Sequence, residues 1–383
     1  MALMDFTQFI IYSLTSFLAY ILTLAIYRLY LHPLSSFPGP RLASLTHWYE
    51  QYFHLIQDGQ FIFELERLHN LYGPIIRINP DELHIRDSEF FSTIYAGAAP
   101  GRKIDKLEVF TRPAGAHTAA FSTVGHDLHR SRRGALNPFF SKRNVSKLEP
   151  RLVSKVNLLI DRLALFAGTN KPVELHVATS AFTADVITEY CYGKEGCTNY
   201  LAVEDFKPDW TACIQSVFEN SAFRRCFPWM TDALQVLPVG WVLKVVPGME
   251  VLIRWQMDLH KQVEKVFSDY HVRTEKSEKR EEEETTVFSS LLANEELPPV
   301  EKSVQRLADE AEIIVAAGTD TTARTICVTV FYVLSDPIIL KTLTEELKSA
   351  MLDKTTLPAW TELEKLPYLV GDTLSVSGDH CAC

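Results

Sequence analysis

Residues 317–322 read Ala-Gly-Thr-Asp-Thr-Thr, inside a long apolar pattern at 304–333 that is typical of a helix. Five residues that weaken helices follow one another here, and glycine alone costs about 1 kcal/mol relative to alanine in a helix interior. Threonine hydroxyls can also bond back to carbonyls one turn earlier and open the helix. We expect a local opening that leaves room for a small ligand and water; a kink without function is the alternative.

An acid and an alcohol stand next to each other in this stretch, as Asp320 and Thr321. A carboxylic acid beside a hydroxyl can pass protons to a ligand that lies against the helix, which is general acid–base chemistry. These residue types therefore indicate a groove in which protons are transferred to a bound ligand.

The rest of the sequence predicts a mainly α fold with a small β part. Two short strands, at 75–78 and 83–86, flank the turn Asn79-Pro-Asp81 and predict a hairpin. Helical periodicity marks most other segments, and the clearest of them are 48–71, 145–166, 180–192, 251–272, 304–333 and 337–351.

The N-terminus predicts a membrane anchor over residues 1–30. Residues 6–27 contain neither a charge nor a proline, and as a helix they extend about 33 Å, enough to cross a bilayer. A removable signal peptide is the alternative, but it needs a basic start and a small-residue cleavage site, which are absent. Arg28, His32 and Arg41 follow the apolar run and predict a cytosolic body. A proline-rich hinge, 31–44, contains the stiff Phe37-Pro-Gly-Pro40.

Charge and cysteine content exclude several classes of protein. The formal charge of −10 argues against nucleic-acid binding. Seven cysteines without a Cys-x-x-Cys pair indicate neither a disulfide framework nor a structural zinc site. Residues 101–160 nevertheless hold twelve Lys or Arg against four Asp or Glu. This basic segment predicts an anionic group or an acidic partner nearby, or else a solvated basic face.

The stretch at 317–322 resembles the central helix of the cytochrome P-450 family, the haem-thiolate monooxygenases, whose pattern is [AG]-G-x-[DE]-T-[TS]. Further segments come in the order that this family shows, and they are the anchor, the Phe-Pro-Gly-Pro hinge, Tyr72-Gly-Pro74, His126-Asp-Leu-His-Arg130 in the place of W-x-x-x-R, and 137–141. The resemblance covers residues 1–369. It is closest to fungal members of the trichodiene-oxygenase type, which act in secondary metabolism.

The resemblance implies cofactor-binding residues on two helices. Arg130 matches the arginine that pairs with a haem propionate, for which a guanidinium fork is suited. His126 stands where most members have tryptophan and can donate to the same propionate; a pair of surface histidines, His126 and His129, is the alternative. Ala317 and Gly318 match the positions that let the groove lie against the haem.

The resemblance also implies a catalytic pair and a cellular setting. Asp320 and Thr321 match the pair that delivers protons. The family uses haem, takes electrons from an NADPH-cytochrome reductase, and is held in the endoplasmic-reticulum membrane by a single span with a cytosolic body. Its fungal members imply an apolar substrate of the terpenoid or polyketide kind.

Two motifs of the family are missing from the last residues. No Glu or Arg follows Lys365, so the E-x-x-R helix is not found, and neither Cys381 nor Cys383 fits the loop F-x-x-G-x-R-x-C-x-G. We therefore expect a partial cytochrome P-450 domain at 45–369, an unrelated tail at 370–383, and a C-terminally truncated chain that is inactive as it stands. A degenerate or misassembled gene product and a membrane-anchored interaction protein are the alternatives.

The anchor can be tested at Leu18, near the middle of the apolar run. Leu18→Arg should weaken insertion by about 2.5–3.5 kcal/mol, because the charge has to enter hydrocarbon. Carbonate-resistant membrane pelleting measures this, with Leu18→Phe as the control. Unchanged pelleting of the arginine variant, with residues 6–27 open to protease, would contradict a spanning anchor.

Overall fold

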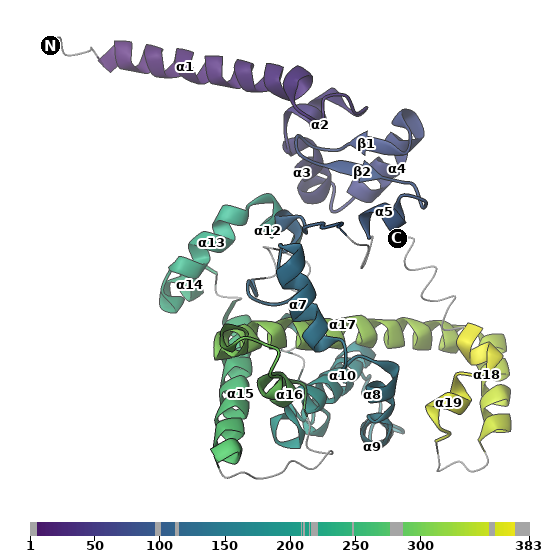
Figure 1. Cartoon of the computed structure of the whole chain (residues 1–383). Coiled ribbons are helices and arrows are strands. Elements are labelled where there is room, and N and C mark those ends of the chain that lie inside the picture. The colour runs from purple at the N-terminus through teal and green to yellow at the C-terminus, as the bar shows by residue number, and fades with distance from the viewer. Residues whose placement is uncertain are drawn as a thin grey trace. The chain divides into compact units, whose positions relative to one another are not determined.

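The computed structural model describes residues 6–95, 101–111, 115–207, 209, 211–213, 215, 221–246, 249–275, 286–351 and 357–371 (Figure 1). Within these residues the chain is mostly helical and holds one two-stranded sheet. The predicted fold class, mainly α with a small β part, is confirmed. The chain divides into two units, residues 1–104 with 222–227 and residues 105–221 with 228–383. Residues 372–383 of the predicted tail lie outside the described part.

The first unit begins with the predicted apolar helix. Helix α1 (Phe6–Ile26) continues into the π-helical turns of η1 (Tyr27–Leu31), and no side chain of α1 is buried. Together they form a helical segment of 26 residues that is long and apolar enough to cross a membrane. An exposed apolar helix of this length is stable in a bilayer, where its backbone groups bond within the helix.

The remaining elements of the first unit are short. They are α2 (Arg41–Leu45), α3 (Trp48–Gln51), η2 (Tyr52–Ile56), α4 (Phe61–Tyr72), β1 (Ile75–Arg77), β2 (Leu83–Ile85), α5 (Phe91–Ile94) and α12 (Ser221–Cys226). The predicted hairpin is confirmed, with Ile75 opposite Ile85 in an antiparallel pair. The single helix expected at 48–71 is wrong, because Asp58 and Gly59 adopt φ values of 49° and 83° and interrupt it.

The proline-rich segment lies along β1. The backbone N–H of Arg77 donates to the carbonyl of Pro38 at 2.8 Å, and the Arg77 guanidinium donates to the carbonyl of Arg28 at 2.8 Å. Gly39 approaches β1 so closely that a Cβ there would lie 2.3 Å from the carbonyl oxygen of Arg77. Buried Arg77 therefore fixes the end of the anchor and the predicted hinge to the same strand.

The second unit is built around one long helix, α17 (Val304–Ser335). The other elements are α6 (Glu108–Thr111), α7 (His126–Leu136), α8 (Lys142–Ser146), α9 (Glu149–Ala164), α10 (Leu175–Tyr192), η4 (Lys194–Gly196), η5 (Tyr200–Ala202), α13 (Pro228–Val236), α14 (Val239–Val245), α15 (Glu250–Glu275), α16 (Val287–Ala293), η8 (Pro299–Lys302), α18 (Pro337–Ala350) and α19 (Trp360–Leu363). The helix predicted at 304–333 is confirmed, as are those at 180–192, 251–272 and 337–351. The one predicted at 145–166 is divided between α8 and α9.

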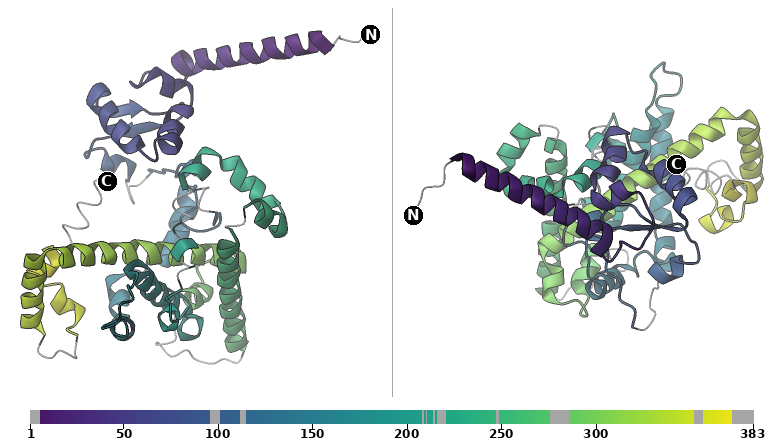
Figure 2. Two further views of the ribbon diagram at one scale, coloured as in Figure 1. Left: turned by 180° about the vertical axis from the view of Figure 1, so that it is seen from behind. Right: turned by 90° about the horizontal axis from the view of Figure 1, so that it is seen from above.

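Helix α10 is the main packing partner of α17, while α15 and α18 contact α17 and stand at its two ends (Figures 1 and 2). Most of α10 is buried, and Ala178, Ala181 and Ala184 have no exposed surface. Small side chains let two helix backbones approach closely, so hydroxyl groups of α10 reach carbonyls of α17. Thr183 donates to the carbonyl of Thr319 at 3.0 Å, and Thr179 donates to that of Ala323 at 3.3 Å.

Because the proline-rich segment packs closely on β1, adding one methyl group at Gly39 is predicted to lower the stability of the first unit. Gly39→Ala should lower the free energy of unfolding of the first unit by about 1–3 kcal/mol, because the Cβ has to displace backbone. Pulse proteolysis over a urea series measures the change. In the matched control, Gly134→Ala in α7, the Cβ meets nothing within 4 Å, so the variant should be as stable or slightly more stable. Equal stability of both variants would contradict the contact.

Candidate functional site

Residues 317–322 lie within α17, and the helix continues through them without a break. The expected opening of the helix is therefore wrong, although the hydroxyls do bond back. Thr319 donates to the carbonyl of Val315, and Thr321 to that of Ala317, both at 2.7 Å. The helix stays closed because α10 supports it at this point. Gly318 is part of that support, since a Cβ there would lie only 3.0 Å from the side chain of Ile187 in α10.

The acid of the stretch, Asp320, is held on the packed side of α17. Its residue is 8% exposed. Oδ1 lies 3.3 Å from Nε2 of His176 in α10, and Oδ2 lies 3.8 Å from Nε of Arg324 one turn later. An imidazole ring and a guanidinium therefore face the two oxygens of this carboxylate.

The alcohol lies on a different face of the same helix. Ala317 and Thr321 are one turn apart and both exposed, as is Thr325 one further turn on. These three residues form the open stripe of α17. Consecutive residues in a helix differ by about 100° around its axis, so Asp320 and Thr321 cannot share a face. The structure thus brings together Ala317 and Thr321, and it separates Asp320 and Gly318 from them.

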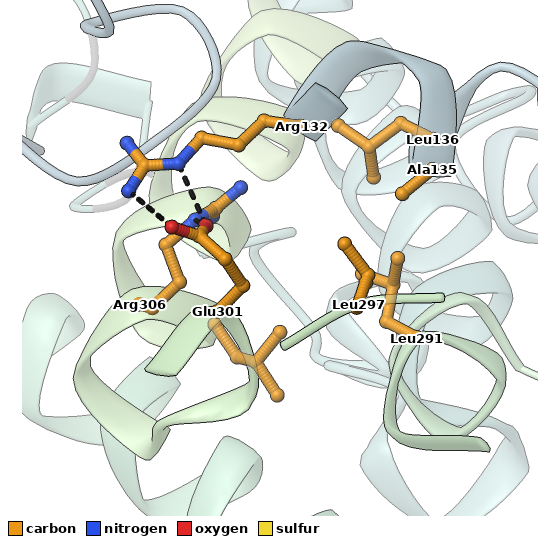
Figure 3. Close-up of a pocket in the computed structure, with 8 residues that line it drawn as sticks. Arg132, Ala135, Leu136, Leu291, Leu297, Glu301 and Arg306 are labelled. Carbon is orange, nitrogen blue, oxygen red and sulfur yellow. Dashed lines mark hydrogen bonds and ion pairs between the residues drawn. The ribbon is translucent and has the colours of Figure 1, made fainter. Parts of the chain in front are cut away.

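Helix α7 is held to the start of α17 by a buried ion pair that the sequence analysis missed (Figure 3). Arg132 donates to both carboxylate oxygens of Glu301, from Nε at 2.7 Å and from Nη2 at 2.9 Å. Arg306 donates to the same carboxylate from Nε at 3.2 Å. The hydrogen bonds from Arg132 hold the pKa of Glu301 below its usual value, although burial opposes this. The Glu301 carboxylate therefore stays charged and fixes α7 beside α17.

The next acid along α17 extends this contact to the segment before α7. Arg306 pairs with Glu310 at 2.6 Å, and the same oxygen of Glu310 accepts the backbone N–H of Ala120 at 2.9 Å. Asp309 accepts the backbone N–H and the hydroxyl of Thr118, at 2.8 and 2.6 Å. Acidic side chains of α17 therefore position the chain that leads into α7.

The predicted haem-binding residues of α7, His126 and Arg130, lie away from this ion pair. They share a helix face with two further basic residues, His129 and Arg133, because each of the four lies three or four positions from two of the others. Lys106 faces the same group. Burial lowers the pKa of His129, and the charges of Lys106, Arg133 and His126 lower it further. We call these five residues the α7 cation cluster, and it is suited to binding an anion.

Sequence reasoning identified part of this cluster only. The basic excess at 101–160 pointed to an anionic group, and the spacing of His129 and Arg133 would have added both to the site. Nothing in the residue types separates Arg132 from its neighbours. A helical projection distinguishes it, because Arg132 falls on the same side of α7 as Ala135 and Leu136, which line the pocket at Glu301.

Taken together, the fold and the site define a mainly helical protein with an N-terminal apolar helix, an acid–alcohol helix and a cationic helix face. Residues 40–371 match the cytochrome P-450 family. Among curated relatives, the cytochrome P-450 monooxygenase sdnE of Sordaria araneosa is 40% identical over 357 residues, which cover 92% of this chain and 68% of that protein. The monooxygenases tpcC of Cochliobolus heterostrophus and TRI4 of Fusarium sporotrichioides are each 38% identical, and the match covers 92% of this chain and 65% of theirs.

The chain belongs to the cytochrome P-450 family, and its relatives are monooxygenases of fungal secondary metabolism. It spans about two-thirds of the length of the curated relatives that it matches.

Two features of the second unit fit the haem that this family uses. The open stripe of α17 presents only a methyl group at Ala317, and the α7 cation cluster is suited to carboxylates such as propionates. Cys191, Cys197 and Cys213 are buried, and the Cys327 thiol lies 3.2 Å from the Thr179 hydroxyl of α10. Cys381 and Cys383 lie outside the described residues.

The pair between Arg132 and Glu301 predicts a loss of stability that depends on pH. Arg132→Met should lower the free energy of unfolding by about 3 kcal/mol near neutral pH, at the low end for breaking a buried pair, because Arg306 remains. The lowered pKa of Glu301 means that its contribution is present above the ordinary pKa of a carboxyl group and is lost as the pH falls. Urea denaturation at neutral and acidic pH should therefore show a smaller difference in acid.

The control for this prediction is Arg130→Met, which removes an exposed arginine from the same helix. Its effect should stay within about 0.5 kcal/mol at both pH values. If both variants lose the same stability, the ion pair does not hold α7.

Proposed function

We propose that the second unit forms one side of the haem site of a cytochrome P-450 monooxygenase that oxidises an apolar secondary metabolite. The division of α17 into two faces supports this most directly. The open stripe offers a small side chain and a hydroxyl, at Ala317 and Thr321, while the carboxylate of Asp320 is kept on the packed side. A planar cofactor and an apolar substrate both require a wall without bulk or charge at these positions.

Haem, when bound, supplies the oxidising chemistry, and the residues of this chain supply its setting. Ala317 leaves room for the ring beside α17. The α7 cation cluster, which includes His126 and Arg130, holds the propionates by charge-assisted hydrogen bonds. Gly318 contributes indirectly, since its contact with Ile187 sets how closely α17 lies against α10.

The acid and the alcohol divide the handling of protons between them. Thr321 lies on the open stripe. Its hydroxyl can donate a proton to a group bound against this face of α17 and can accept a proton from Asp320. Asp320 lies on the packed side of α17, and a change of its side-chain rotamer brings the proton toward Thr321. This role requires that Asp320 leave its position against α10 during the reaction.

Membrane and partner follow from the first unit and from the charge distribution. Helix α1 is proposed to hold the protein in the endoplasmic-reticulum membrane, with the chain that follows η1 on the cytosolic side. The basic segment 101–160 is proposed to lie near an acidic surface of an NADPH-cytochrome reductase, because complementary charge speeds association. We further propose that no described cysteine of the second unit ligates the iron.

The relay can be tested in a form that binds haem. We call this form the completed enzyme: residues 1–369 continued by the C-terminal third of the Sordaria araneosa relative, with thiolate ligation checked by the spectrum with carbon monoxide. In the completed enzyme, Thr321→Ala should lower product formation about 10²-fold, within the usual range for general acid–base groups, while NADPH is still consumed. The ratio of product to NADPH measures the coupling.

Thr325→Ala is the matched control. Thr325 lies on the same open stripe, and its hydroxyl bonds back to the carbonyl of Thr321 at 2.9 Å. Coupling should be unchanged in this variant. A normal ratio of product to NADPH in Thr321→Ala would remove Thr321 from the mechanism.

A further inference from the structure

Asp320 is held by a partner that the acid–alcohol pattern does not contain. Nε2 of His176 lies 3.3 Å from Oδ1 of Asp320, and the two side chains are 22% and 11% exposed. Nε2 itself is out of contact with solvent. The imidazole edge that carries Nε2 is therefore directed into the protein at Asp320, and the remainder of the ring reaches the surface.

The position of His176 is fixed by its helix. It is the second residue of α10, which begins after the N-cap residue Glu174. One turn later, Thr179 bonds to the carbonyls of both His176 and Ala323, so the first turn of α10 is tied to α17 next to Asp320. The short distance between the imidazole and the carboxylate is thus a consequence of how the two helices pack.

We propose that His176 is a positioning residue for Asp320 and supplies it with protons from solvent. This inference rests on the proposed function, because it assigns a source to the proton that Asp320 carries. The exposed part of the ring makes His176 the link between bulk water and an acid that is itself almost fully buried. Histidine is the side chain suited to this, since it gains and loses a proton near neutral pH.

The proton transfer balances without any further reactant. The neutral ring, which carries its hydrogen on Nε2, takes a proton from hydronium at Nδ1, on its exposed edge, and becomes an imidazolium, releasing a water molecule. The N–H bond at Nε2 then breaks and an O–H bond forms at Oδ1 of Asp320, so that an ion pair becomes two neutral groups. The ring is left with its hydrogen on Nδ1 and regains the hydrogen at Nε2 by exchange with water while Asp320 is turned away. Neutral Asp320 is held less strongly by His176, and a change of its side-chain rotamer can turn the carboxyl group toward Thr321. After it gives up the proton, the carboxylate returns to His176.

Among the described residues, Arg324 is the other charged group that faces Asp320, and its role differs from that of His176. Its Nε lies 3.8 Å from Oδ2, and its side chain is 60% exposed. A guanidinium remains protonated in proteins, so Arg324 cannot supply a proton. It favours the charged carboxylate and so favours the return of Asp320 after each transfer.

The contact can be tested in the chain as it stands, without haem. Diethyl pyrocarbonate modifies accessible, uncharged imidazole rings, and peptide mass spectrometry reads each histidine separately. Asp320→Asn should raise the labelling rate of His176 at least threefold, because a neutral amide attracts the ring less strongly than a carboxylate and leaves its inner edge more accessible to the reagent. His271, an exposed histidine of α15, should label at an unchanged rate and is the internal control. An unchanged rate at His176 would overturn the proposal.

The proton supply is tested in the completed enzyme. His176→Ala should lower the ratio of product to NADPH at least tenfold, and added imidazole should restore it, because the cavity left by the ring opens to solvent. His176→Gln keeps an N–H group near Asp320 but cannot transfer a proton, so it should stay impaired, with labelling of the other histidines unchanged. Full coupling in His176→Gln, or an alanine variant that imidazole does not rescue, would overturn the proton supply.

Asp320→Asn separates this inference from the proposed function. If Asp320→Asn is fully coupled, Asp320 has no part in the reaction and the proposed relay itself fails. If Asp320→Asn is impaired while His176→Ala is normal, the relay stands and only the role of His176 is wrong.

Discussion

The close packing of α10 on α17 determines how α17 is rotated about its axis, and the proposed site depends on that rotation. Alanine side chains bring the two backbones together, and the hydroxyls of Thr179 and Thr183 then reach carbonyls of α17. These bonds join fixed points of both helices, so a turn of α17 by one residue would break them. The same contact places Asp320 at His176 and leaves Thr321 on the open stripe.

The second constraint is electrostatic and concerns α7. Buried charges are stable only when they are paired and hydrogen-bonded, and Arg132, Glu301, Arg306 and Glu310 meet this condition as a continuous chain. Such pairs contribute more to a defined geometry than to stability, because burial costs much of what the attraction provides. Because the ion pair holds the Arg132 side of α7 against the start of α17, the α7 cation cluster lies on the other side of α7, where an anion can reach it.

Much of the fold follows from sequence patterns, and the failures have physical reasons. Long helices and the hairpin were predicted because periodicity and turn residues act locally. The break at Asp58 was missed although Asp58-Gly59 is a turn signal, because apolar periodicity on both sides of it was read as one helix. The opening expected at 317–322 does not form, because α10 supports the helix from outside, and propensity alone cannot show a neighbouring helix.

The site was predictable to a similar extent. Residue types and spacing marked Asp320 and Thr321 as an acid and an alcohol, but only the packed structure shows that they lie on different faces. His176 is more than 140 positions earlier in the sequence and carries no motif, so its contact with Asp320 depends on tertiary packing. Arg132 likewise differs from Arg130 and Arg133 only in the direction in which its helix turns it.

The division of α17 into two faces is the central claim, and thiol labelling tests it directly. Single cysteines are introduced at Ala317 and Thr321 on the open stripe, and at Thr319 and Ala323 on the packed side. Labelling of the folded chain with a thiol reagent is then read peptide by peptide. The structure predicts fast reaction at 317 and 321 and slow reaction at 319 and 323, with equal rates after denaturation. Fast labelling at 319 and 323, or protection at 317 and 321, would contradict it.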